Sequence, residues 1–176
     1  MNNYNTSLIL IGMPSAGKST IGKLLAESLK KEFIDSDKLI EQQQQETLQH
    51  IVDNQGYLAL RNIEEKTLLA TELPNHIIAT GGSAVYSMEA MQHLKHFGLI
   101  IFLDVDLIEL QARMDDFATR GIARAPKQSF TELFAERRPL YQKYADITIE
   151  CRGKSPQEIL TAIIGEESEA YTEMDA

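Results

Sequence analysis

A glycine-rich stretch near the start of the chain restricts its fold more than any other feature of the sequence. Residues 12–20 satisfy the phosphate-binding P-loop pattern G-x-x-x-x-G-K-[ST]. The apolar run at residues 8–11 is long enough for a buried strand, and apolar residues at helical spacing follow the glycine-rich stretch. Strand, loop and helix therefore arrive in the order that the motif requires. We expect the chain to bind a nucleoside triphosphate.

Each part of this motif has a physical task. Gly12 and Gly17 let the backbone curl, so that N–H groups and the positive end of the following helix point at phosphate oxygens. Lys18 would reach the β- and γ-phosphates, and the Ser19 hydroxyl would ligate Mg²⁺. We expect a nucleotide site made of the following residues: Gly12, Ser15, Ala16, Gly17, Lys18, Ser19 and Thr20.

Composition narrows the kinds of partner that the chain can have. Its 176 residues suit one domain, and the net charge of −9 argues against nucleic acid, whose phosphates require basic surfaces. No apolar run approaches the length of a membrane span, so no membrane partner is expected. Cys151 is the only cysteine, which excludes an intrachain disulfide and suits a reducing cytosol. Because residues 1–7 lack the basic start of a secretion signal, we expect a cytoplasmic protein. We also expect a small-molecule substrate and a monomer, although the sequence itself does not determine the oligomeric state.

Short apolar runs alternate with helical periodicity along most of the chain. Strands are expected at residues 8–11, 33–37, 76–79, 99–103 and 147–149, with helices between them, one at 105–114. This alternation predicts an α/β fold of the P-loop NTPase type, a three-layer αβα arrangement with a five-stranded parallel sheet. Residues 1–165 should form one domain. Residues 115–128 should form a lid loop, and the acidic tail, residues 166–176, should be disordered.

Two aspartates follow the second predicted strand, at the sheet edge where ligands bind in such folds. Asp35 and Asp37 could face one crevice, where one would support Mg²⁺ and the other would accept a proton from an attacking hydroxyl. Taken alone, Asp-Ser-Asp favours a helix cap, but beside a P-loop the functional interpretation is favoured. Asp104 also fits a metal-binding pattern because five apolar residues precede it. Its other interpretation is helix capping, by Asp104 or by Asp106.

Arginines are the next signal in this acidic chain. Arg61 lies within an apolar helix face, where an unpaired charge would be costly, so it should have an anionic partner. Arg120 and Arg124 lie in the predicted lid, where phosphoryl-transfer enzymes place mobile, charge-neutralising arginines. For any one of these arginines, a surface salt bridge is the simpler interpretation.

Taken together, these motifs resemble those of the shikimate kinase family over about residues 8–164. Residues 35–37 match the family's D-[ST]-D, in which the first aspartate supports Mg²⁺ and the second binds substrate hydroxyls. Arg61, with Leu60 in place of the usual phenylalanine, matches the F-R-x-x-E arginine that grips the substrate carboxylate. The resemblance thus implies a metal site of Ser19 and Asp35.

Later motifs follow in matching order. Residues 80–83 match the segment with the glycine triplet that lets substrate approach the backbone, with serine as the third member. Arg137 matches the first residue of R-x-P-L-Y and is implied to be the second carboxylate-binding arginine. Arg113 matches the arginine that lies against adenine, and Arg120 matches the lid arginine that contacts the transferring phosphate.

The resemblance implies that the chain phosphorylates shikimate with ATP and Mg²⁺. The implied catalytic residues are Lys18, Asp37 and Arg120, and Arg113 and Arg120 join the P-loop in binding the nucleotide. Asp104 is then only a strand-end residue. The implied substrate residues are Asp37, Arg61, Gly81, Gly82 and Arg137.

Two departures from the family pattern keep other hypotheses open. Residues 121–123 read Gly-Ile-Ala where the family usually has Pro-Leu-Leu, which implies a more flexible lid, and the glycine triplet ends in serine. A related P-loop kinase for another small hydroxy acid, such as gluconate or homoserine, is therefore the main alternative. A GTPase-like switch is less favoured because the guanine signature N-K-x-D is absent from the sequence. Nucleotide kinases need larger lids and inserts than 176 residues accommodate.

Overall fold

Five short strands form the parallel sheet around which the other elements are arranged. The computed structural model describes residues 6–114 and 120–174. Its strands are β1 (Ser7–Ile11), β2 (Glu32–Asp35), β3 (His76–Ala79), β4 (Gly98–Asp104) and β5 (Ile147–Glu150), in the order β2-β3-β1-β4-β5. Every neighbouring pair is parallel. The central strand β1 is buried along its whole length, as its unbroken apolar run predicts.

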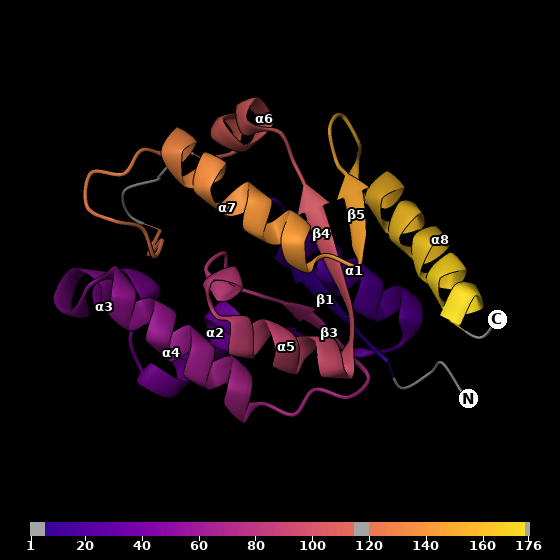
Figure 1. Cartoon of the computed structure of the whole chain (residues 1–176), viewed down its shortest axis with the longest axis horizontal. Helices are drawn as coiled ribbons and strands as arrows, with labels where there is room; N and C mark the ends of the chain where they lie inside the picture. The colour runs from indigo at the N-terminus through magenta and orange to yellow at the C-terminus, as the bar shows by residue number, and fades with distance from the viewer. Residues whose placement is uncertain (1–5, 115–119, 175–176) are drawn as a thin grey trace.

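Helices cover both faces of this sheet (Figure 1). On one side α1 (Lys18–Leu29) packs against α8 (Pro156–Met174). On the other side lie α5 (Met88–Phe97) and α7 (Phe130–Tyr144), and α5 also packs against α4 (Tyr57–Ala70). The three-layer αβα prediction is confirmed. The remaining elements are α2 (Ser36–Gln44), α3 (Leu48–Gln55), the 3₁₀ turn η2 (Ala84–Tyr86) and α6 (Leu107–Ala112).

The second strand ends earlier than the sequence predicts. A strand was expected through residue 37, but α2 begins at Ser36 because Asp35 caps it. The Asp35 Oδ1 atom accepts hydrogen bonds from the backbone N–H groups of Asp37 (3.1 Å) and Lys38 (3.4 Å). This side chain satisfies helix donors that would otherwise lack partners, so the capping interpretation of Asp35 is correct at this point. Asp37 therefore projects from the first helical turn.

The aspartates after β4 divide their tasks. The helix predicted at residues 105–114 is shorter, α6, and Asp106 is its cap, accepting from the Glu109 N–H at 2.8 Å. Asp104 instead accepts two hydrogen bonds from Arg138, at 3.0 and 2.6 Å. This forked ion pair ties α7 to the end of β4 and gives Asp104 a structural role.

The acidic tail is helical where the sequence predicts disorder. Helix α8 continues through Met174, while residues 175–176 lie outside the described part of the chain. Two contacts explain the correction. Ala170 packs against the main hydrophobic core, and the charge of Glu167 interacts with that of Lys31. Helical stability in proteins comes mostly from tertiary packing of this kind.

Two hydrophobic clusters hold the layers together. The larger surrounds the sheet, and the smaller joins α2, α3 and α4 through Ile40, Leu48, Ile51 and Leu60. Ala123, from the predicted lid, is the fifth member of the smaller cluster. Segment 120–128 is therefore docked on these helices, whereas residues 115–119 of the predicted lid lie outside the described residues. Within the described residues, no helix combines the length and apolarity needed to cross a membrane.

Candidate active site

The P-loop connects β1 to α1 with the backbone that its glycines permit. Gly12 and Gly17 have φ angles of +147° and +94°, which side chains rarely adopt. A Cβ atom on Gly12 would also lie 3.0 Å from the Leu103 carbonyl oxygen of β4. The path from strand to helix therefore depends on both glycines for turning and on Gly12 for close approach to β4.

Lys18 is a buried cation at the start of α1. Its Nζ atom donates to the carbonyl oxygens of Gly12 (2.8 Å) and Met13 (2.9 Å), which holds it inside the loop. Burial lowers the pKa of Lys18 to about 8, although the charge of Asp37 opposes this shift. A cation kept this close to its deprotonation point suits a pocket that receives negative charge.

Ser19 and Asp35 lie together, as the resemblance implies for a metal site. The Ser19 hydroxyl donates to Asp35 Oδ2, while Oδ1 of the same carboxylate caps α2. One side chain thus serves both the structural and the functional interpretation drawn from the sequence. Hydroxyl and carboxylate oxygens are the hard ligands that Mg²⁺ accepts, usually one or two from the protein with water and phosphate oxygens completing the shell.

Two arginines from the segment after β4 contact the P-loop. Arg113, at the end of α6, donates to the Ser15 carbonyl oxygen at 3.4 Å and pairs with Glu109. Arg120 donates to the Ser15 hydroxyl. Both arginines predicted to contact the nucleotide therefore lie against the phosphate loop and line the same cavity as Asp37.

Glu64, which is buried, and Asp37, which is half-buried, form a pair of carboxylates beside this loop. Burial raises the pKa of Asp37 to about 6, and burial together with the charge of Asp37 raises the pKa of Glu64 to about 7. A Cβ atom on Gly81 would lie 2.5 Å from Asp37 Oδ1 and 2.3 Å from Glu64 Oε1, so both carboxylates crowd this glycine. Ser83 donates to Glu64 Oε2, while Oε1 is buried without a hydrogen-bond partner among the described residues.

Sequence reasoning had noticed Glu64 only as part of a motif. A glutamate on a helix normally faces solvent, and nothing in its own neighbourhood of residues 61–65 marks it as buried. The serine that ends the glycine triplet is the one sequence feature that indicates a buried polar partner such as Glu64. Ser83 is buried and supplies the hydrogen bond that Glu64 needs in this position.

Arg61 and Arg137 approach each other from α4 and α7. Arg137 is 1% exposed, and its Nη2 donates to the Ala123 carbonyl oxygen at 2.7 Å, while Arg61 Nη2 donates to the same oxygen at 3.2 Å. Arg61 also pairs weakly with Glu136, 3.8 Å away. The anionic partner expected for Arg61 is thus present at its edge, but its closest oxygen comes from the lid backbone.

One cavity unites most of these residues. It has a volume of about 520 Å³ and is bounded by the P-loop, Asp35, Asp37, Glu64, Arg137 and the lid segment 120–123. Two predicted substrate residues do not line it: Gly81 lies behind the carboxylates, and Arg61 lies behind Ala123. The cavity therefore has a phosphate end, formed by the P-loop, and an acceptor end, formed by Asp37, Glu64 and Arg137. Arg61 lies outside the lining of the acceptor end.

Comparison with known proteins identifies the lineage of this site. A sequence model described as shikimate kinase matches residues 14–166, which is most of the chain. The chain belongs to the shikimate kinase family. The shikimate kinase of Francisella tularensis subsp. novicida is 34% identical over 161 residues, covering 89% of this chain and 92% of the relative. That of a Sulfurihydrogenibium species is 31% identical over 159 residues, covering 90% and 95%.

Solved shikimate kinases share the fold as well as the sequence pattern. The enzyme from Acinetobacter baumannii, solved in complex with shikimate, has a TM-score of 0.82 at 29% identity and covers 91% of both chains. The enzyme from Aquifex aeolicus has a TM-score of 0.76 at 30% identity, covering 90% of this chain and 94% of its own. A sugar kinase from a Janibacter species, at 16% identity and a TM-score of 0.55, shares the fold alone.

Proposed function

We propose that this chain transfers the γ-phosphoryl group of ATP to a hydroxyl of shikimate, forming shikimate 3-phosphate and ADP. The observation that carries the proposal is one cavity in which a P-loop faces the carboxylates of Asp37 and Glu64 and the buried Arg137. Membership of the shikimate kinase family and the likeness to a relative solved with shikimate support this acceptor.

The phosphate end of the cavity holds ATP. Lys18, the N–H groups of the loop and Arg120 surround the phosphates with positive charge, and Arg113 lies where the base end of the nucleotide would rest. These groups stabilise the charge that shifts toward the leaving ADP as the bond to the γ-phosphorus breaks.

Ser19 and Asp35 would hold Mg²⁺. Their hydroxyl and carboxylate oxygens are adjacent, which fits an ion that takes few protein ligands. When bound, the ion would supply charge neutralisation to the phosphates. The Asp35 carboxylate is oriented for this by its second task as the cap of α2.

The acceptor end positions the hydroxyl and the carboxylate of the substrate. Asp37, whose pKa of about 6 leaves it ionised at pH 7, accepts the proton as the hydroxyl oxygen bonds to phosphorus. Arg137 receives the substrate carboxylate, and Arg61 joins it when the Ala123 carbonyl oxygen gives way. Holding both ends of a small rigid acid keeps the hydroxyl in line with the phosphoryl group.

An acceptor panel tests the proposal. Purified protein with ATP and Mg²⁺ is assayed for ADP release with shikimate, gluconate and homoserine, and Lys18→Met serves as the control that ties turnover to this P-loop. We expect turnover with shikimate and none with the other two acids. Turnover with gluconate or homoserine and none with shikimate would establish the alternative hypothesis, a P-loop kinase for another small hydroxy acid. The Gly-Ile-Ala sequence of the lid is the observation that favours this alternative.

The proposal also includes the cellular location and the oligomeric state. We place the enzyme in the cytoplasm, where ATP is available and thiols stay reduced, and we expect it to be a monomer. Cys151 suits that setting because it is buried, and burial raises the pKa of its thiol to about 11, which keeps it unreactive. Sedimentation of the purified protein would test the monomer prediction.

A further inference from the structure

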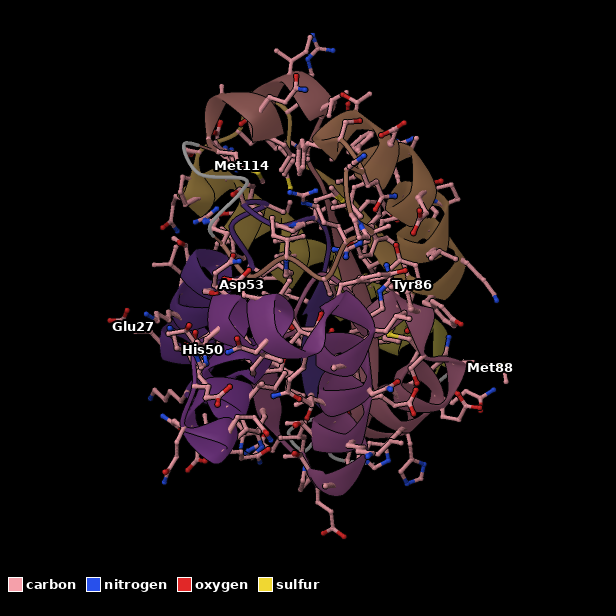
Figure 2. All side chains as sticks on the ribbon, turned by 90° about the vertical axis from the view of Figure 1, so that its left-hand side faces the viewer. Glu27, His50, Asp53, Tyr86, Met88 and Met114 are labelled. Atoms are coloured by element: carbon pink, nitrogen blue, oxygen red, sulfur yellow. The ribbon has the colours of Figure 1, made fainter. Side chains whose placement is uncertain are left out.

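Tyr86 occupies the space between the two arginines of the acceptor end. It is the last residue of η2, which packs against both α4 and α7. Figure 2 shows Tyr86 near the level where the purple helices meet the brown α7. The residue does not line the cavity, so its contacts are with other side chains of the site.

The Tyr86 ring supports Arg61. The guanidinium carbon of Arg61 lies 3.5 Å from the ring centroid of Tyr86, and on another side 5.1 Å from that of Tyr57. A guanidinium stacked on an aromatic face keeps its charge compensated while its edge stays available for hydrogen bonds. This matters because Arg61 Nε is buried without a hydrogen-bond partner among the described residues.

The Tyr86 hydroxyl connects to Arg137. Arg137 Nε donates to it at 3.3 Å, and the Arg137 guanidinium carbon lies 5.3 Å from the same ring. The hydroxyl in turn donates to Glu136 Oε1, and this hydrogen bond keeps the pKa of Glu136 below its usual range. Gln128, at the base of the lid segment, donates to the other oxygen of Glu136 at 2.7 Å.

Tyr86 therefore contacts both Arg61 and Arg137, and its hydroxyl is held by the carboxylate of Glu136. Arg61 and Arg137 carry like charges that repel each other, so their shared approach to one oxygen needs groups that hold them together. The Tyr57 ring lies beside Arg61 and otherwise packs against the smaller hydrophobic cluster. Tyr86 contacts both through two different parts of its side chain.

We propose that Tyr86, anchored by Glu136, is a positioning residue that sets the spacing of Arg61 and Arg137 and so determines affinity for the acceptor carboxylate. This inference rests on the proposed function. Tyr86 lies outside the matched motifs. Its sequence position after a glycine turn is typical of a residue that only packs in the core, so the sequence does not predict its role. The role predicts an effect on acceptor binding that is separate from nucleotide binding.

The test compares two Tyr86 variants with a control variant in steady-state kinetics. Tyr86→Phe keeps the ring on Arg61 but loses the link to Arg137 and Glu136, so we expect KM for shikimate to rise about tenfold, the value of one hydrogen bond to a charged group. KM for ATP and kcat at saturation should stay within about twofold of wild type. Tyr144→Phe, which removes a hydroxyl elsewhere on α7, should leave all three constants unchanged. Tyr86→Leu, which also removes the stacked ring, should raise KM for shikimate about a hundredfold.

Several outcomes overturn the inference. Tyr86→Phe and Tyr86→Leu with wild-type KM for shikimate would contradict it, as would equal losses in KM for ATP, which indicate a general structural role. Melting temperatures of the variants separate the second outcome from misfolding, because Tyr86→Phe is a mild change that should leave the fold intact. If wild type itself fails to phosphorylate shikimate, the proposed function fails and the inference falls with it. If wild type is active and Tyr86→Phe equals it, only the inference fails.

Discussion

Arg61 on α4 and Arg137 on α7 donate to the same atom, the carbonyl oxygen of Ala123, at 3.2 and 2.7 Å. The space between two guanidinium groups, which this carbonyl oxygen fills, is also suited to an oxygen of a substrate carboxylate. The lid backbone thus provides an acceptor for both cations where the proposed function places the acid. Substrate binding at this end should then exchange one oxygen acceptor for another, rather than create an arginine pair from separate parts.

Arg61→Ala should weaken acceptor binding specifically. The variant removes one of two charge-assisted donors, so we expect KM for shikimate to rise about 10- to 100-fold while KM for ATP changes little. Steady-state kinetics with each substrate varied in turn measures this split. Arg152→Ala is the control, because Arg152 is exposed and pairs with Asp106 away from the cavity. A collapse in ATP affinity would place Arg61 outside the acceptor site.

Gly121→Ala should loosen the docked lid. Gly121 has a φ of +63°, and a Cβ atom there would lie 2.5 Å from the Gln49 nitrogen of α3. Its own N–H donates to Gln49 Oε1 at 2.7 Å, so the substitution should break this contact as well. We expect trypsin to cleave after Arg124 faster in this variant than in wild type, measured by mass spectrometry under native conditions.

Gly153→Ala is the matched control for that experiment. Gly153 has nearly the same φ, +67°, but a Cβ atom there would meet nothing within 4 Å. It therefore reproduces the backbone strain without the collision. Equal cleavage rates in wild type and Gly121→Ala would show that the close approach to α3 does not hold the lid.

Asp35→Asn and Asp104→Asn should separate the two candidate metal carboxylates. Asp35 lies beside Ser19 in the cavity, whereas Asp104 is engaged by Arg138. We expect Asp35→Asn to raise the Mg²⁺ concentration for half-maximal activity about tenfold or more, and Asp104→Asn to leave it unchanged. Titration of Mg²⁺ at fixed ATP provides the measurement. A dependence on Asp104 instead would assign the metal to the end of β4.

The acid side of the pH profile should report the titration of Asp37. Asp37, with its pKa raised to about 6, loses its ability to accept a proton as the pH falls through that value, so kcat/KM for the acceptor should decline there. The charge of Glu41 contributes to the raised pKa of Asp37, so Glu41→Gln favours ionisation of Asp37 and should move this decline to lower pH. Glu65→Gln, on α4, is the control. An unmoved acid limb in Glu41→Gln would mean that the limb does not report Asp37.

Most of the fold could be predicted because its signals are local. The apolar runs of β1 and β4 and the glycines of the P-loop each determine their own backbone, and all five strands lie where the sequence predicts them, apart from one or two residues at their ends. The acidic tail was mispredicted because its helix depends on a distant contact, the packing of α8 on α1. The acidic composition of the tail predicts disorder. The local sequence does not show which distant residues pack against the tail.

The site divides in the same way. Asp35 and Asp37 could be predicted from their place after a strand, but the cap on α2 and the shared position of Glu64 arise from tertiary packing. The docking of residues 120–123 on α3 was not predictable either. Glycine at position 121 suggested flexibility, whereas in the structure it permits a close approach that no larger residue would allow.

Kinetics with shikimate and its neutral carboxamide measure the central claim most directly, namely that a carboxylate is bound by Arg137 and Arg61 opposite the P-loop. The two acceptors have the same shape and hydroxyls and differ in one charge. We predict that the carboxamide loses about 100-fold or more in kcat/KM while KM for ATP is unchanged, because two charge-assisted donors lose their partner. Equal kcat/KM values for the two acceptors would contradict the account.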